Sequence, residues 1–135
     1  MRRFIMIKAK ILLSFVLSIM LLSSCASSGG SVNSYRQISM SEAAEMMKNE
    51  TGYIILDVRR ADEFAEGHIP GAINLPNESI GTEKIPALPD KAQLILVYCR
   101  SGRRSKEASE KLVKLGYTNI VEFGGILDWT GEIEK

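Results

Sequence analysis

Cysteine, histidine and tryptophan are scarce in this sequence of 135 residues, which contains two, one and one of them respectively. A single histidine and the absence of a C-x-x-C pair exclude the usual clustered zinc-ligand motifs. No glycine-rich phosphate-binding motif is present either. We therefore expect the protein to use neither a metal nor a cofactor.

Charge of either sign is not in excess, because 17 lysine and arginine residues face 16 aspartate and glutamate residues. Four of the basic residues lie within the first 24 positions, which contain no acidic residue. If those positions are removed, 13 basic residues remain against 16 acidic ones. Such a chain has no general affinity for nucleic acid, so we expect no nucleic-acid partner.

The sequence also lacks an apolar run of about 20 residues, the length that a helix needs to span a bilayer. Its N-terminus instead has a basic start, a shorter apolar stretch at residues 11–22 that includes Ser14 and Ser18, and then small residues. This order is typical of an export signal. We therefore predict that residues 1–24 are a signal peptide outside the folded core.

The end of this segment, Leu22-Ser23-Ser24-Cys25, resembles the lipobox of bacterial lipoproteins. In a lipobox, a signal peptidase cuts before the cysteine, whose sulfur carries a diacylglyceryl group. The resemblance implies that Cys25 is lipidated and anchors the exported protein to the cell membrane or outer membrane, facing the periplasm or the exterior. The alternative is an ordinary secretory signal that leaves Cys25 as a free thiol. Residues 25–34, rich in serine and glycine, then form a flexible tether.

Residues 35–135 have the pattern of one α/β domain. A capping box of Ser39 and Glu42 predicts the start of a first helix. Two apolar runs without alternation, residues 53–56 and 94–98, predict central strands covered on both faces. Weaker strand signals at residues 72–75 and 119–123 lie between helical stretches. We therefore expect a mainly parallel sheet flanked by helices.

Cys99 directly follows the second apolar run. The segment C-R-S-G-R-R-S, residues 99–105, then leads into a helix that carries Ala108 and Leu112 on one face. Open α/β sheets bind ligands at the carboxyl ends of their strands. A turn at that edge directs backbone N–H groups and the positive end of the helix toward one point, which stabilises a thiolate. Cys99 is therefore the predicted nucleophile.

This segment resembles the active-site loop of the single-domain rhodanese family, in which a cysteine at the start of a six-residue loop carries sulfur as a persulfide. Here the loop is C-R-S-G-R-R, residues 99–104. Other family motifs lie before and after this loop in the family's order, and the resemblance spans nearly all of residues 37–129. It implies a rhodanese-like three-layer domain with a mainly parallel five-stranded sheet. The other matching strings are L-D-V-R at 56–59, E-F at 63–64, G-H-I-P-G-A-I-N-L-P at 67–76, and G-G-I at 124–126 with Trp129.

The same resemblance implies sulfurtransferase activity of the thiosulfate:cyanide type. Cys99 would attack the outer sulfur of a donor such as thiosulfate, release sulfite, and pass the sulfur to an acceptor. The expected partners are thus a small sulfur-containing anion and a thiol or cyanide-like acceptor, the latter on a small molecule or a protein.

The rest of the loop supplies the candidates for substrate binding. Guanidinium groups make paired hydrogen bonds to oxyanions, although we do not expect all three loop arginines to point inward. The candidates are Arg100, Ser101, Gly102, Arg103 and Arg104.

Three polar residues outside the loop receive supporting roles. Asp57 and Arg59 follow a central strand at the same edge of the sheet as Cys99. They either orient loop arginines and substrate or, as we favour, form a structural ion pair. His68, the one histidine, lies in a G-H-I-P-G turn that resembles a family turn away from the nucleophile. We expect a structural hydrogen bond from it rather than general-base chemistry.

Three other functions use similar features. Cysteine phosphatases and arsenate reductases typically leave five residues between cysteine and arginine, whereas Arg104 leaves four after Cys99, and Tyr98 replaces the histidine before many phosphatase cysteines. Rhodanese-like domains also serve as protein-binding modules, often with the cysteine replaced. Thiol–disulfide exchange would require a resolving cysteine from a second protein. The retained Cys99 and loop arginines favour the sulfurtransferase.

Overall fold

The computed structural model describes residues 34–135. The predicted signal peptide, the predicted lipidation site Cys25 and nearly all of the tether therefore lie outside the described residues. Among the helices within residues 34–135, none has the length and apolar character needed to cross a bilayer.

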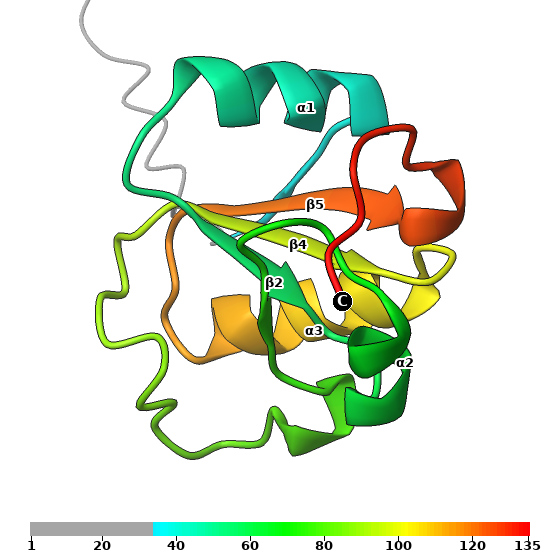
Figure 1. Ribbon diagram of the computed structural model, residues 1–135. Coiled ribbons are helices and arrows are strands. Elements are labelled where there is room, and N and C mark those ends of the chain that lie inside the picture. Colours follow the sequence, from blue (N-terminus) through cyan, green and yellow to red (C-terminus); the bar gives the residue numbers. More distant parts are fainter. Residues whose placement is uncertain (1–33) are drawn as a thin grey trace, which may run out of the picture. The chain divides into compact units, whose positions relative to one another are not determined.

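The sheet has five strands in the order β1-β5-β4-β2-β3, and every pairing is parallel. Figure 1 shows β4 in the middle, between β5 and β2. The parallel five-stranded sheet confirms the predicted fold class. The weaker strand signals at residues 72–75 and 119–123 correspond to β3 and β5. The sequence gives no signal for the edge strand β1, because its two residues are polar and exposed. The strands are β1 (Arg36–Gln37), β2 (Ile54–Asp57), β3 (Ile73–Asn74), β4 (Ile95–Cys99) and β5 (Ile120–Gly125).

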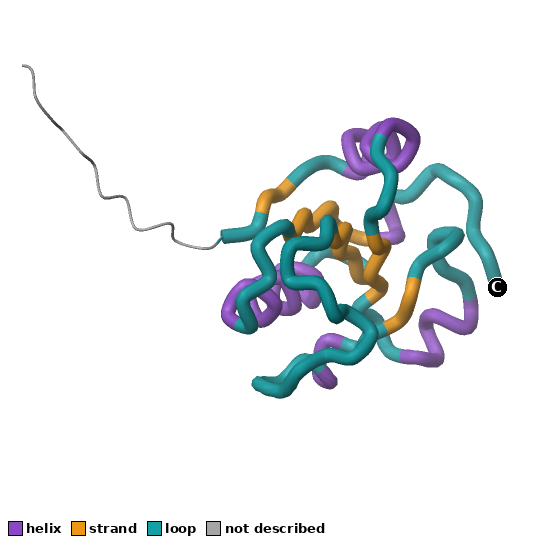
Figure 2. The backbone as a smooth tube through the Cα atoms, turned by 90° about the vertical axis from the view of Figure 1, so that its left-hand side faces the viewer, coloured by secondary structure: helices purple, strands orange, loops and turns teal. Residues whose placement is uncertain are grey.

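Helices cover both faces of the sheet, with α1 (Met40–Asn49) on one face and α3 (Arg103–Lys114) on the other (Figures 1 and 2). The predicted capping box starts α1, because the Ser39 side chain accepts from the Glu42 N–H and Glu42 accepts from the Ser39 N–H. The short helix α2 (Ala61–Glu66) follows β2. Two 3₁₀ turns, η1 (Asn77–Ser79) and η2 (Ile126–Asp128), complete the elements.

The two faces of β4 divide the core into two clusters. Leu96 and Tyr98 pack in the cluster on the α1 side, and Val97 and Cys99 pack in the cluster on the α3 side. All five residues of β4 are buried, which explains why the run lacks alternation. The strand therefore delivers the Cys99 side chain to the α3 face of the sheet, where the helix begins.

Candidate active site

The Cys99 sulfur lies inside the turn between β4 and α3. Arg100 to Gly102 form this turn, and Gly102 has a φ of +105°, a left-handed conformation that favours glycine. The Gly102 N–H donates to the Cys99 Sγ at 3.0 Å. The whole residue is only 1% exposed, so protein groups rather than water surround the sulfur. This contact is one that stabilises a thiolate or a persulfide anion.

The end of β5 fixes the position of this turn. A Cβ atom built on Gly125 would lie 2.1 Å from the Arg100 carbonyl oxygen and 2.5 Å from the Ser101 Cα. Only glycine allows the two backbones to approach this closely. The two glycines thus have different physical reasons: Gly125 lets the end of β5 approach the cysteine turn, and Gly124 adopts a φ of +95°.

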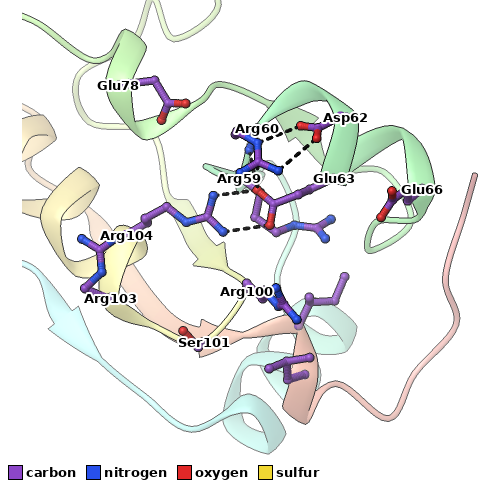
Figure 3. A pocket seen from close by; sticks show the side chains of 12 residues that line it. Arg59, Arg60, Asp62, Glu63, Glu66, Glu78, Arg100, Ser101, Arg103 and Arg104 are labelled. Carbon is purple, nitrogen blue, oxygen red and sulfur yellow. Dashed lines mark hydrogen bonds and ion pairs between the residues drawn. The ribbon is translucent and has the colours of Figure 1, made fainter.

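A cavity of about 700 Å³ opens above the turn. Its lining comes from the cysteine turn, the start of α3, α2 and the residues around η2 (Figure 3). Arg100 and Ser101 are both exposed in this cavity. Cys99 itself is buried and is not among the lining residues, whereas the next two residues of the turn, Arg100 and Ser101, are. The full lining is Arg59, Arg60, Asp62, Glu63, Glu66, Glu78, Arg100, Ser101, Arg103, Arg104, Ile126 and Leu127.

The three loop arginines have different surroundings. Both terminal nitrogens of Arg104 donate to Glu63 of α2, at 2.7 and 2.9 Å, and the two side chains point toward each other in Figure 3. Arg103 turns away from this pair and bonds Glu107 at 2.6 Å on the surface of α3. Arg100 has no hydrogen bond or ion pair from its side chain to any residue in the range 34–135. Arg100 is therefore the loop arginine most available to a bound anion.

The Glu63–Arg104 pair connects α2 to the cysteine turn. The two hydrogen bonds from Arg104 are the main cause that lowers the pKa of Glu63 to about 2. In return, Glu63 raises the pKa of Arg104. The sequence motif E-F contained this glutamate, but no pattern assigned it a partner 41 residues away.

Replacing Glu63 by glutamine should remove a pH-dependent part of the stability. Because the pKa is lower in the folded chain than its ordinary value of about 4.3, the pair stabilises the fold above that pH, and this stability is lost as the pH falls through about 2. We expect Glu63→Gln to lower the free energy of unfolding by about 1–2 kcal/mol at pH 7. The difference in the free energy of unfolding between Glu63→Gln and the parent protein, measured by urea unfolding, should become smaller as the pH falls from 4.5 to 2.

The control is Glu45→Gln, since Glu45 pairs with Lys48 on the exposed surface of α1. We expect it to change stability by less than about 0.5 kcal/mol at any pH. An equal loss in both variants at pH 7, or a loss in Glu63→Gln that persists at pH 2, would contradict the assignment.

Asp57 and Arg59 form a buried pair behind the cavity. Arg59 donates to both carboxylate oxygens of Asp57, at 2.7 to 3.1 Å, and also to the Gly67 carbonyl at 2.7 Å. Asp57 is fully buried and Arg59 is 6% exposed. Within the described part of the chain, neither side chain bonds a loop arginine. This arrangement is a structural ion pair of the kind expected from the sequence, although Arg59 also reaches the cavity wall.

His68 likewise has the surroundings of a structural residue. Its Nδ1 lies 3.0 Å from the Phe64 carbonyl, and its ring stacks on that of Phe64 at 3.7 Å between centroids. It is not among the residues that line the cavity above Cys99.

Two further polar residues lie below the sulfur, and sequence reasoning gave neither a role. The Cys99 thiol donates to Ser105 Oγ at 3.5 Å, and Ser105 Oγ donates to Glu122 Oε1 at 2.6 Å. Ser105 is fully buried and Glu122 is 2% exposed. Ser105 directly follows the loop. The one signal for Glu122 was a carboxylate within an apolar strand.

Comparison with known proteins connects these features to one family. Residues 39–132 match the model of the rhodanese-like domain. Over 73 residues the chain is 38% identical to thiosulfate sulfurtransferase PspE of Escherichia coli, covering 54% of this chain and 70% of that protein. It is 31% identical over 94 residues to a sulfurtransferase of Allochromatium vinosum, covering 69% and 86%.

Solved structures give the same result. A structure described as a rhodanese with anions from E. coli is 37% identical, covers 62% of this chain and 98% of that one, and superposes with a TM-score of 0.56. The arrangement of strands and helices around the cysteine turn is thus similar to that of solved rhodaneses.

Proposed function

Because this chain belongs to the rhodanese-like domain family, we propose that it is a sulfurtransferase that carries sulfur as a persulfide on Cys99. The observation that supports this most is the position of the sulfur. It accepts a hydrogen bond from the Gly102 N–H, and the next two residues of the same turn, Arg100 and Ser101, line a cavity rich in arginines. Sulfur transfer is the activity named for the similar proteins of E. coli and A. vinosum.

The proposed reaction has two half-reactions. In the first, the Cys99 thiolate attacks the outer sulfur of thiosulfate, a new S–S bond forms, and sulfite leaves with the electrons of the broken bond. In the second, an acceptor attacks the outer sulfur of the persulfide and the Cys99 thiolate leaves. Cyanide as acceptor gives thiocyanate, and a thiolate on a small molecule or a protein gives a persulfide of its own. Charge balances in both steps, and neither step requires a metal or a redox cofactor.

The groups around the sulfur have different roles in this proposal. Gly102 N–H donates to the reacting sulfur. Arg100 and Ser101, exposed in the cavity, bind the anionic oxygens of the donor. Arg104 positions the turn through Glu63 instead of binding the donor, because both of its terminal nitrogens are already paired. Arg103 contributes positive charge at the rim.

Thiocyanate formation from thiosulfate and cyanide tests this proposal. The protein should show turnover, and Arg100→Gln should raise the KM for thiosulfate about tenfold with little change in kcat, because it removes a charged hydrogen bond. The matched control is Arg36→Gln on the exposed edge strand β1, which should leave both constants unchanged. No turnover with a reduced Cys99 would refute thiosulfate as donor, and an unchanged KM in Arg100→Gln would refute its role.

We further propose that the protein is exported and held at a membrane by lipid on Cys25. The support is the signal-like segment and the lipobox-like string at residues 22–25. Two acyl chains suffice for stable anchoring. The test is fractionation of cells that express the parent protein or Cys25→Ser. The parent should sediment with membranes and Cys25→Ser should not, whereas equal distribution of the two would refute the anchor.

A further inference from the structure

Glu122 is a buried acidic residue to which the proposed reaction so far gives no part. It lies on β5, faces the α3 side of the sheet and is 2% exposed. In residues 34–135, no lysine, arginine or histidine forms an ion pair with it. Burying a carboxylate without a cation costs free energy, so neighbouring hydrogen-bond donors must stabilise it.

Those neighbours connect it to the reacting sulfur. The Gly124 N–H donates to Glu122 Oε1 at 2.9 Å, and the Ser105 hydroxyl donates to the same oxygen at 2.6 Å. Ser105 Oγ also lies 2.9 Å from the Gly102 carbonyl and 3.3 Å from the Gly124 carbonyl. A hydroxyl has one hydrogen, and the short contact to a carboxylate is the strongest of the three.

With its hydrogen directed at Glu122, Ser105 presents a lone pair to the thiol. The Cys99 S–H donates to that oxygen at 3.5 Å, within the range for sulfur donors. The three side chains therefore form one continuous chain of donors and acceptors from Sγ to Oε1. We propose that Glu122 is the proton acceptor for Cys99, with the Ser105 hydroxyl as the carrier between them.

The transfer is balanced. The S–H proton moves to Ser105 Oγ while the Ser105 hydroxyl proton moves to the Glu122 carboxylate. Thiol and carboxylate thus become thiolate and carboxylic acid, and the net charge of the three groups does not change. Ser105 then donates to the thiolate, which adds to the donation from the Gly102 N–H. The negative charge is moved from a buried acid to the nucleophile that needs it.

Other titratable groups near the Cys99–Ser105–Glu122 hydrogen bonds lie on α3, just before β1 and in the cysteine turn. Arg104 of α3 is close enough for the Cys99 charge to contribute to its raised pKa, after the larger effect of Glu63. Before β1, burial raises the pKa of Tyr35, with further contributions from Glu110 on α3 and from Glu122. In the cysteine turn, Arg100 is exposed. None of these groups lies between the sulfur and Glu122, whereas Ser105 bonds both.

The test uses full-length protein with Cys25→Ser, so that Cys99 is the only thiol. Glu122→Gln retains an oxygen that accepts from Ser105 and Gly124 but no longer takes up a proton. We expect the thiolate absorbance of Glu122→Gln to appear at higher pH than in the parent. Its kcat/KM for thiosulfate should be about 10- to 100-fold lower at pH 6 and approach the parent value as the pH rises.

Ser105→Ala breaks the same chain at its centre and keeps the test valid if Glu122→Gln folds poorly. It should shift the pH profiles of thiolate absorbance and of kcat/KM in the same direction as Glu122→Gln. The double variant should lose no more kcat/KM than either single variant. Glu110→Gln removes an acidic residue from the exposed side of α3 and should leave both profiles unchanged.

Two results would overturn the proposal. Unchanged profiles in Glu122→Gln would mean that Glu122 only positions the Gly124 turn. A thiolate that appears at lower pH in Glu122→Gln would mean that Glu122 acts only as a repelling charge. The inference rests on the proposed function, but thiolate absorbance requires no sulfur donor. Loss of sulfur transfer in the parent together with a shifted thiolate profile would therefore refute the reaction and retain the proton acceptor.

Discussion

Replacing Cys99 by serine is expected to reduce thiocyanate formation to the rate of the uncatalysed reaction. A serine hydroxyl is not ionised near neutral pH and cannot hold a second sulfur as a persulfide. The fold should remain, because serine has nearly the same shape and its buried hydroxyl finds a donor in the Gly102 N–H and an acceptor in Ser105 Oγ. We expect a stability change of at most about 1–2 kcal/mol, measured by urea unfolding beside the kinetic assay.

The control is Ser79→Ala, in the 3₁₀ turn η1. Ser79 is exposed and is not among the residues that line the cavity, so this variant should retain its turnover and its stability. Turnover of Cys99→Ser at a substantial fraction of the parent rate would rule out the persulfide. If Cys99→Ser loses both its activity and its folded state, direct detection of the persulfide on the parent protein decides the question.

The largest stability effect should come from Asp57→Asn. This change leaves the Arg59 guanidinium buried, with its charge no longer balanced by the carboxylate that accepts three of its side-chain contacts. Breaking a buried ion pair on one side costs about 3–5 kcal/mol. Urea unfolding at pH 7 should show this loss. Activity should fall as well, because Arg59 reaches the cavity wall and also bonds the Gly67 carbonyl after α2.

Asp62→Asn is a close control, since Asp62 pairs with Arg60 at the surface with both side chains at least 60% exposed. The same chemical change there should cost less than about 1 kcal/mol. The double variant Asp57→Leu with Arg59→Met should lose less than Asp57→Asn alone, because it removes both charges. Equal losses in Asp57→Asn and Asp62→Asn would contradict the importance given to burial.

Local patterns predicted the α/β fold class and placed the candidate nucleophile, Cys99, at the end of a central strand. An apolar run without alternation indicates a strand that is covered on both faces, and β4 is buried along its whole length. A cysteine at the end of such a strand lies at the ligand-binding edge whatever the rest of the chain does. The capping box at Ser39 is similarly local, because both hydrogen bonds span three residues.

Pairings between distant charges could not be predicted in the same way. Arg104 was a candidate to bind the donor, yet its terminal nitrogens meet Glu63, and this depends on where α2 packs. The surroundings of Glu122 likewise depend on distant residues. It pairs in the sheet with Val97, 25 residues earlier in the sequence, and accepts a hydrogen bond from Ser105 of α3. Which side chain neutralises which charge is a property of the packed structure, whereas strand and helix positions follow from short-range periodicity.

Persulfide formation on Cys99 is tested most directly by the intact mass of full-length Cys25→Ser protein before and after thiosulfate, and again after cyanide. We expect a gain of one sulfur, about 32 Da, on Cys99, which cyanide removes as thiocyanate. The Cys99→Ser version of the same protein should gain nothing. A parent protein with a reduced Cys99 that shows no gain in mass would contradict persulfide formation from thiosulfate.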